Sequence, residues 1–172
     1  ASESCLSIND IINQIDYKLN MLISIKNKPK TLNQHIVKTL IPTKNILLNK
    51  FYKDNDQLLL SKKIQKKHMF LNPSDFGIHN SIIAKNKNIF FHDFEYFGWD
   101  DPIKMICDFY WHPGMNINLK LKKYWLCESI KLFKNRKNFI KRFKISLPLY
   151  GFRWSLIVLN DFTNRGKKIF AH

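Results

Sequence analysis

The stretch Asn72–Asn80 (NPSDFGIHN) decides how we interpret this chain, together with Asp93 further along. Asp75 and Asn80 lie five positions apart, and Asp93 follows Asn80 by thirteen. Two short apolar runs, SIIA and IFF, stand between Asn80 and Asp93, and the polar link KNKN joins them. Apolar runs of this length around turn-forming residues predict a β-hairpin. Such a hairpin would fold the chain back and bring Asp93 near Asn80 and Asp75.

These residue types suit the transfer of a phosphoryl group. A carboxylate can take the proton of an attacking hydroxyl, and Mg²⁺ takes oxygen ligands from carboxylates and amide carbonyls. In protein kinases the catalytic-loop Asp is the base, while the loop Asn and the Asp of a later Asp-Phe-Gly hold the metal. We therefore predict Asp75 as the catalytic base and Asn80 and Asp93 as metal ligands. Asp93-Phe94-Glu95 stands where Asp-Phe-Gly would.

At these residues the chain resembles the aminoglycoside phosphotransferase and choline kinase family of kinase-like small-molecule phosphotransferases. That family's signature is roughly His-Gly-Asp-x-His-x-x-Asn, followed by an apolar hairpin that ends in Ile-Asp-x-Glu. The matching segments here read PSDFGIHN and FFHDFEYFGWDDP. The resemblance continues into KMICDFYWHPG and, more weakly, into PLYGFRWSLIVLNDF near the end. Pro73-Ser74 departs from the pattern, because the family has His-Gly before the base.

The resemblance implies an α+β, mainly helical fold: the protein-kinase-like C-terminal lobe with a small catalytic-loop β-hairpin. It also implies an enzyme that uses Mg²⁺ and ATP, or another nucleoside triphosphate, to phosphorylate a hydroxyl of a small molecule. A chance constellation of Asp and Asn in a loop is the alternative, because both residues are frequent in this sequence. The identity of the acceptor stays open.

Three further residues near the predicted site receive supporting roles. Ser74 directly precedes the predicted base, and His79 is expected to be an oriented loop histidine, although histidine can also act as a base or a ligand. Glu95 lies two positions after Asp93 and would share its strand face if the strand continued there. In that position Glu95 would brace the site or approach the metal.

The helix after the hairpin contributes two more candidates. Asp101 followed by Pro102 is a favoured helix start, because Asp is a good N-cap and Pro suits the first helical position. Asp108 lies among apolar residues on this helix. The resemblance implies that Asp108 braces the catalytic loop by hydrogen bonds, and direct contact with the substrate is the alternative.

Helical periodicity dominates the rest of the chain. Ser7 and Asp10 resemble a capping box before apolar residues that recur at helical spacing to about residue 25. HMFL (residues 68–71) is predicted as a strand. Other helices are predicted over residues 31–41 (ended by Pro42), 43–51, 119–133, 138–145 (before Pro148, which interrupts) and 154–159.

The formal net charge is +16, from 29 Lys and Arg against 13 Asp and Glu. Such an excess is typical of nucleic-acid-binding proteins. Here it is mostly lysine spread along the whole chain, which favours a solvated lysine surface, so we do not expect nucleic acid as a partner. A basic nucleic-acid-binding helical domain is the alternative. The charge also disfavours polycationic aminoglycosides and favours neutral or anionic acceptors.

Other features of the composition bear on membrane insertion, on the cellular compartment and on where the nucleotide would bind. No apolar run approaches the roughly 20 residues that span a bilayer, so no membrane span is expected. The three cysteines have no Cys-x-x-Cys spacing, which fits a reducing cytoplasm. The first third of the chain contains no glycine, whereas kinases need a phosphate-covering loop and a strand lysine in an N-terminal lobe. We therefore expect residues 1–172 to form a single C-terminal lobe that is inactive alone, with a catalytically inactive kinase-like scaffold as the alternative.

Overall fold

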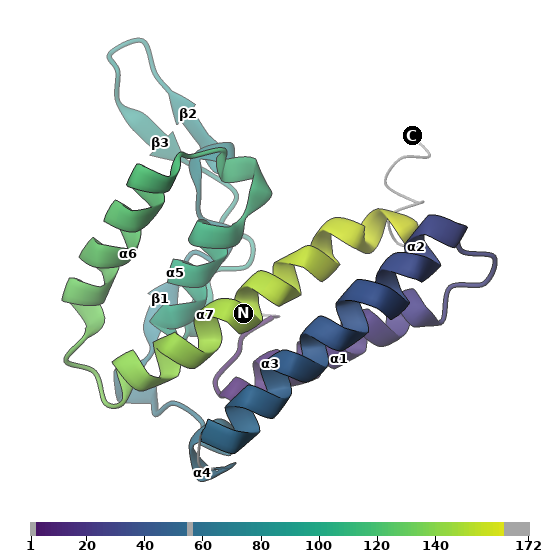
Figure 1. The fold of residues 1–172 in the computed structure, drawn as a ribbon. Helices are drawn as coiled ribbons and strands as arrows, with labels where there is room; N and C mark the ends of the chain where they lie inside the picture. Colours follow the sequence, from purple (N-terminus) through teal and green to yellow (C-terminus); the bar gives the residue numbers. More distant parts are fainter. Residues whose placement is uncertain (1–2, 55–56, 164–172) are drawn as a thin grey trace.

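The structure, a computed structural model, describes residues 3–54 and 57–163, and these are mainly helical (Figure 1). The helix α7 packs against α1, α3 and α5, and α5 also contacts α6. The buried apolar side chains of these helices form one core. The α-helices are α1 (Ile8–Ile23), α2 (Lys30–His35), α3 (Ile41–Asp54), α4 (Gln57–Ser61), α5 (Pro102–Trp111), α6 (Leu119–Phe133) and α7 (Phe139–Val158). Within the described residues, no helix combines the length and apolar character needed to cross a bilayer.

The first helix confirms the reading of its sequence pattern. The hydroxyl of Ser7 accepts a hydrogen bond from the backbone N–H of Asp10 (3.1 Å), and the Asp10 carboxylate accepts one from the N–H of Ser7 (2.8 Å). This pair is the predicted capping box. The face that α1 buries is made of Ile8, Ile11, Ile12, Ile15, Leu19 and Leu22.

The predicted helix end at Pro42 is wrong. Residues 36–40 form a turn of π-helix between α2 and α3, in which Ile41 N–H donates to Ile36 O, five residues back. Pro42 then lies in the first turn of α3, where a missing N–H costs little. Because the preceding turn is widened, the helical path continues through the proline.

The predicted interruption at Pro148 is also wrong, because α7 runs through it. A hydrogen bond from another helix supports α7 beside the proline: the indole N–H of Trp111 on α5 donates to Leu147 O (2.8 Å). The Trp111 ring also packs so closely on Gly151 that a Cβ there would lie 2.8 Å from its Cε2 atom. Packing against α5 therefore supports the part of α7 that a proline weakens.

The β-structure consists of two antiparallel pairs. The predicted hairpin is confirmed: β2 (Ser81–Ile83) pairs with β3 (Ile89–Phe91). The predicted strand near residue 70 is β1 (Phe70–Asn72), which pairs with β4 (Gly98–Asp100), a strand that the sequence analysis did not identify. The loop with Asp75 runs between β1 and β2, and the segment with Asp93 runs between β3 and β4. The short 3-10 turns are η2 (Lys66–His68), η3 (Ile78–Asn80), η4 (Pro113–Met115) and η5 (Leu159–Phe162).

Asp100, the last residue of β4, is a fully buried acid whose two oxygens differ in their hydrogen bonding. It is 0% exposed, and its Oδ1 atom accepts from the backbone N–H groups of Cys5 (3.2 Å) and Asp101 (2.7 Å). Its Oδ2 atom has no hydrogen-bond partner in the described part of the chain. Burial raises the pKa of Asp100 from 3.8 to about 7. The folded state therefore loses stability as the pH rises from about 4 through 7, because the unfolded chain ionises more readily.

We expect Asp100→Asn to raise the free energy of unfolding at pH 8 and to leave it nearly unchanged at pH 4. The amide keeps the Oδ1 acceptor and removes the charge, for a gain of up to about 4 kcal/mol for a shift of this size. Urea unfolding at the two pH values measures the effect. The control Asp54→Asn, at an exposed carboxylate, should change stability at neither pH. A loss of stability at pH 8 would contradict the expectation.

Candidate functional site

The loop between β1 and β2 brings Asp75 and Asn80 into contact, as predicted. The side-chain NH₂ group of Asn80 donates to the backbone oxygen of Asp75 (2.9 Å) and to its carboxylate Oδ2 atom (3.2 Å). Both amide hydrogens are thus directed at Asp75, which leaves Asn80 Oδ1 as the atom available to a cation.

The hairpin places the backbone of Asp93 beside this pair. The N–H of His92 donates to Asn80 O (3.0 Å), so Asp93 is the next residue after the last hydrogen bond of the ladder. Its side chain is exposed and has no hydrogen bond or ion pair with other described residues. The structure therefore brings Asp75 and Asn80 into direct contact, whereas Asp93 is adjacent through the backbone with its carboxylate free.

Two residues of the site have a left-handed backbone: Ser74 with φ of 63° and Asp93 with φ of 64°. Side chains other than glycine rarely adopt this conformation, and such strain is concentrated at functional sites. Glycine adopts this conformation freely, whereas Ser74 adopts it with a side chain. The N–H of Ser74 donates to the buried side chain of Asn72 (2.9 Å), which helps to hold this turn.

Two histidines face the carboxylate of Asp75. Its Oδ1 atom lies 3.1 Å from His79 Nε2 and 3.8 Å from His112 Nε2, and the two imidazole rings stack with centroids 4.0 Å apart. The backbone N–H of Gly114 donates to His112 Nδ1 (3.0 Å), so in the neutral ring Nε2 carries the hydrogen and points it toward Asp75. Burial lowers the pKa of His112, which favours this neutral form.

His112 was not among the predicted site residues. The ligand atoms of Asp75, His79 and His112 all lie within 4.8 Å of one another, an arrangement that can hold a metal ion. The tautomer of His112 argues against that use, because a nitrogen that carries hydrogen cannot bind a metal. We therefore interpret His112 as a residue that orients Asp75. The His-Pro-Gly sequence at the end of the predicted helix was the only signal that could have pointed to it.

Asp108 is the centre of a buried ion-paired network, and its only hydrogen-bonded link to the loop with Asp75 among the described residues runs through Lys104. Its Oδ2 atom lies 2.9 Å from Lys104 Nζ, and its Oδ1 atom accepts from Trp154 Nε1 (2.8 Å) and Arg153 Nη1 (3.4 Å). Lys104 also reaches the hydroxyl of Ser74 (3.5 Å). Although burial opposes ionisation, the charges of Lys104 and Arg153 hold the pKa of Asp108 below its ordinary value. The spacing of Lys104 and Asp108, one helical turn apart, was a signal for this pair.

The two remaining predicted residues lie outside this contact network. Asp101 caps α5 by accepting from the N–H of Ile103 (3.1 Å), as predicted, and forms an ion pair with Arg142. Glu95 was expected to share a strand face with Asp93 if the strand continued there, and this condition is not met: β3 ends at Phe91, and the left-handed backbone of Asp93 breaks the extended conformation. Glu95 lies in a turn, where its charge raises the pKa of Tyr96.

A cavity of about 460 Å³ opens beside Asp75. Its wall includes Ser74, Asp75 and His112, together with the aromatic rings of Tyr96 and Trp154. The lining also contains charged side chains of both signs, among them Lys104, Asp108 and Arg153, so a ligand here would be a polar small molecule. The carboxylate of Asp75 is therefore placed where it can meet a group of a bound small molecule.

Comparison with protein-family models, curated proteins and solved structures finds no match for this chain. Its function must then be inferred from the geometry of the site itself. The most informative part of that geometry is the contact between Asp75 and Asn80, next to Asp93 and at the edge of a cavity.

Proposed function

We propose that this chain is the C-terminal lobe of a kinase-like phosphotransferase. It would transfer a phosphoryl group from Mg²⁺ and ATP, or another nucleoside triphosphate, to a hydroxyl of a small molecule. The observation that carries the proposal is the hydrogen-bonding of Asn80: its NH₂ group donates to Asp75, and its backbone oxygen accepts from the N–H of His92, the residue before Asp93. A base and two oxygen donors, supplied by the β1–β2 loop and by the segment after β3, are the set that this chemistry needs.

Each residue has a distinct role in the proposed reaction. The acceptor hydroxyl binds in the cavity and gives its proton to Asp75, which His79 and His112 hold in position. Asn80 Oδ1 and the Asp93 carboxylate would hold Mg²⁺, which supplies neutralisation of the phosphate charge. The lobe that clamps the nucleotide would be a separate part of the protein, because the described residues contain no glycine-rich phosphate loop.

The metal assignment can be tested on this chain with Mn²⁺, which replaces Mg²⁺ at oxygen sites and broadens nearby NMR signals. We expect selective broadening of the amide signals around Asn80 and Asp93. Asp93→Asn should weaken Mn²⁺ binding about tenfold or more, because it removes a charged ligand. The control Asp54→Asn should leave the affinity unchanged.

The result that would contradict these metal ligands involves the histidines beside Asp75. Broadening that survives Asp93→Asn but disappears in His112→Gln would place the ion on the Asp75, His79 and His112 cluster instead. That result would contradict the proposed metal ligands.

A further inference from the structure

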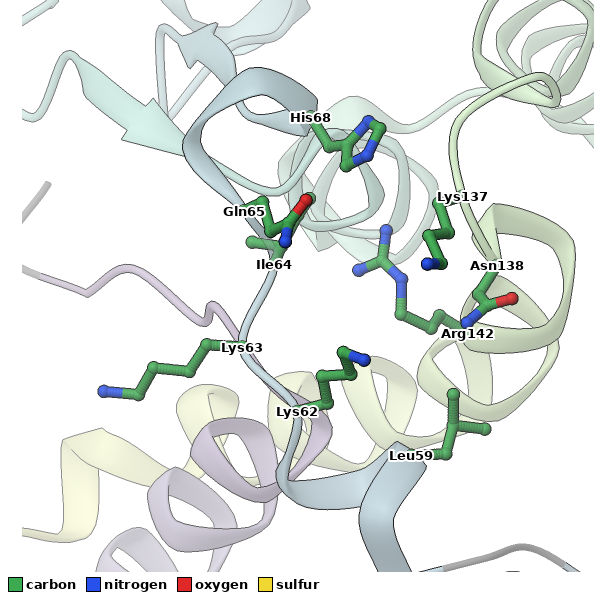
Figure 2. A pocket seen from close by; sticks show the side chains of 9 residues that line it. All are labelled: Leu59, Lys62, Lys63, Ile64, Gln65, His68, Lys137, Asn138 and Arg142. Atoms are coloured by element: carbon green, nitrogen blue, oxygen red, sulfur yellow. The ribbon is translucent and has the colours of Figure 1, made fainter.

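Helix α7 runs past two cavities, and its second half reaches the candidate site. The start of α7 borders a small cavity of about 50 Å³, whose lining residues, Arg142 among them, are shown in Figure 2. Arg142 forms its ion pair with Asp101, which lies outside the contacts around Asp75. Further along α7, Trp154 lines the larger cavity beside Asp75. A link between α7 and the site therefore involves this second half of the helix.

Trp154 makes two contacts with the end of α5, one helical turn apart. Its indole N–H donates to Asp108 Oδ1 (2.8 Å). Its ring meets the ring of His112 edge-on, with centroids 4.5 Å apart and planes at 72°, a geometry that aromatic rings prefer. Asp108 and His112 lie four positions apart, so one side chain can reach both. Trp154 thus joins the buried ion-paired network to the histidine beside the proposed base.

The ring of His112 connects this contact to Asp75. It stacks on the ring of His79, with centroids 4.0 Å apart and planes 9° from parallel, and both Nε2 atoms face Asp75 Oδ1. The N–H of Gly114 also donates to His112 Nδ1 (3.0 Å). That hydrogen bond joins residues only two apart and moves with its own turn, whereas Trp154 belongs to another helix. The contact with Trp154 therefore ties the histidine pair to the helical body.

We propose that Trp154 is a positioning residue, which fixes the ring of His112 and, through the stacked histidines, the carboxylate of Asp75. The inference rests on the proposed function, in which Asp75 is the base of a phosphoryl transfer. A base must lie within hydrogen-bond reach of the proton that it removes, and a misplacement of about 1 Å can cost about 10² in rate. Loss of Trp154 would therefore slow the reaction without removing any group that takes part in it.

The position of the His112 ring can be tested on the full 172-residue chain through the NMR signals of its two imidazole nitrogens. In the unchanged protein we expect one neutral tautomer, with the hydrogen on Nε2. Trp154→Leu removes both contacts with α5 and should bring the two nitrogen signals closer together, because a ring that is free to turn exchanges between tautomers. Trp154→Phe keeps a ring beside His112 and should change these signals less.

Trp111→Phe is the matched control. Trp111 is another tryptophan that joins α5 to α7, through the hydrogen bond from its indole N–H to Leu147 O (2.8 Å). The substitution removes the same kind of contact between the same two helices, so it should lower stability. We expect it to leave the nitrogen signals of His112 in place.

Turnover of the two-lobed protein gives the second measurement. Trp154→Leu should lower kcat about tenfold or more and leave KM for the nucleotide within about twofold, because it displaces the base and keeps the metal ligands. Added to His112→Gln, Trp154→Leu should cost less than about a further twofold in kcat, because its effect passes through His112. Trp111→Phe should change kcat less than about twofold, since it does not act on the base.

Unchanged His112 nitrogen signals in Trp154→Leu would overturn the proposal. An equal loss of kcat from Trp154→Leu with and without His112→Gln would also overturn it, because the effect would then not pass through His112. Equal effects of Trp111→Phe and Trp154→Phe on the His112 signals would overturn it as well, since they would reflect helix packing in general. If the His112 signals respond as expected but the two-lobed protein shows no turnover, the ring is positioned by Trp154 and the phosphotransferase function is wrong.

Discussion

Asp93→Ala is expected to abolish phosphoryl transfer and to weaken the binding of Mg²⁺ and nucleotide. Asp75→Asn is expected to slow the reaction by about 10² to 10⁴ and to leave nucleotide binding nearly intact. Alanine at position 93 removes a ligand, so the phosphate charge is less neutralised. Asparagine at position 75 keeps the shape of the base and a hydrogen bond to the acceptor but is a far poorer proton acceptor.

Steady-state phosphorylation assays and nucleotide titrations measure these two effects. They need the nucleotide-clamping lobe that the proposal includes, and residues 1–172 alone are expected to show no turnover. Asp54→Asn is the matched control, because it removes an exposed carboxylate from α3. If Asp75→Asn lowered nucleotide affinity as much as Asp93→Ala does, and left the single-turnover rate unchanged, the two roles would be wrongly assigned. Nucleotide binding without turnover in the two-lobed protein would support the inactive scaffold instead.

Asp108→Ala is expected to lower the free energy of unfolding by about 3 to 5 kcal/mol, the typical cost of breaking a buried ion pair from one side. The substitution would leave Lys104 and Arg153, whose side chains are 3% and 2% exposed, without their shared carboxylate. Because the pKa of Asp108 lies below its ordinary value, this stabilisation is present above about pH 4 and is lost as the pH falls through the folded-state pKa.

Urea unfolding at pH 7 measures this loss. Asp108→Asn should cost less than Asp108→Ala, because its amide oxygen can still accept from Trp154 Nε1. Adding Lys104→Met to Asp108→Ala should recover part of the loss by removing the buried charge. A loss below about 1 kcal/mol for Asp108→Ala would mean that the network contributes little to folding.

The parts of the structure that the sequence predicts well are those set by neighbouring residues. The capping box of α1 involves residues three apart, and the hairpin depends on two apolar runs joined by four polar residues. Asp75 and Asn80 meet for the same reason, since a single loop contains both. Local turn chemistry and side-chain periodicity are sufficient in each of these cases.

The parts that the sequence does not predict depend on long-range contacts. Pro148 stays within α7 while Trp111, from another helix, holds the backbone beside it. Arg153 reaches Asp108 across 45 residues, and Lys104 reaches Ser74 across 30. A single sequence does not encode such pairings as a spacing, because they arise only when helices pack.

The pairing of β1 with β4 has a consequence for how the candidate site is built into the chain. Asn72 lies opposite Gly98, so residues 73–97 form one closed excursion that leaves the helical body and returns to it at the same place. Asp75, Asn80 and Asp93 all belong to this excursion, whereas Lys104, which reaches Ser74 at its base, belongs to the body together with its partner Asp108. The proposed reactive groups thus lie on one continuous segment between two paired ends, whereas His112, which orients Asp75, stays on the helical body. An exchanged segment would therefore keep its chemistry only where the body supplies a matching partner for the base.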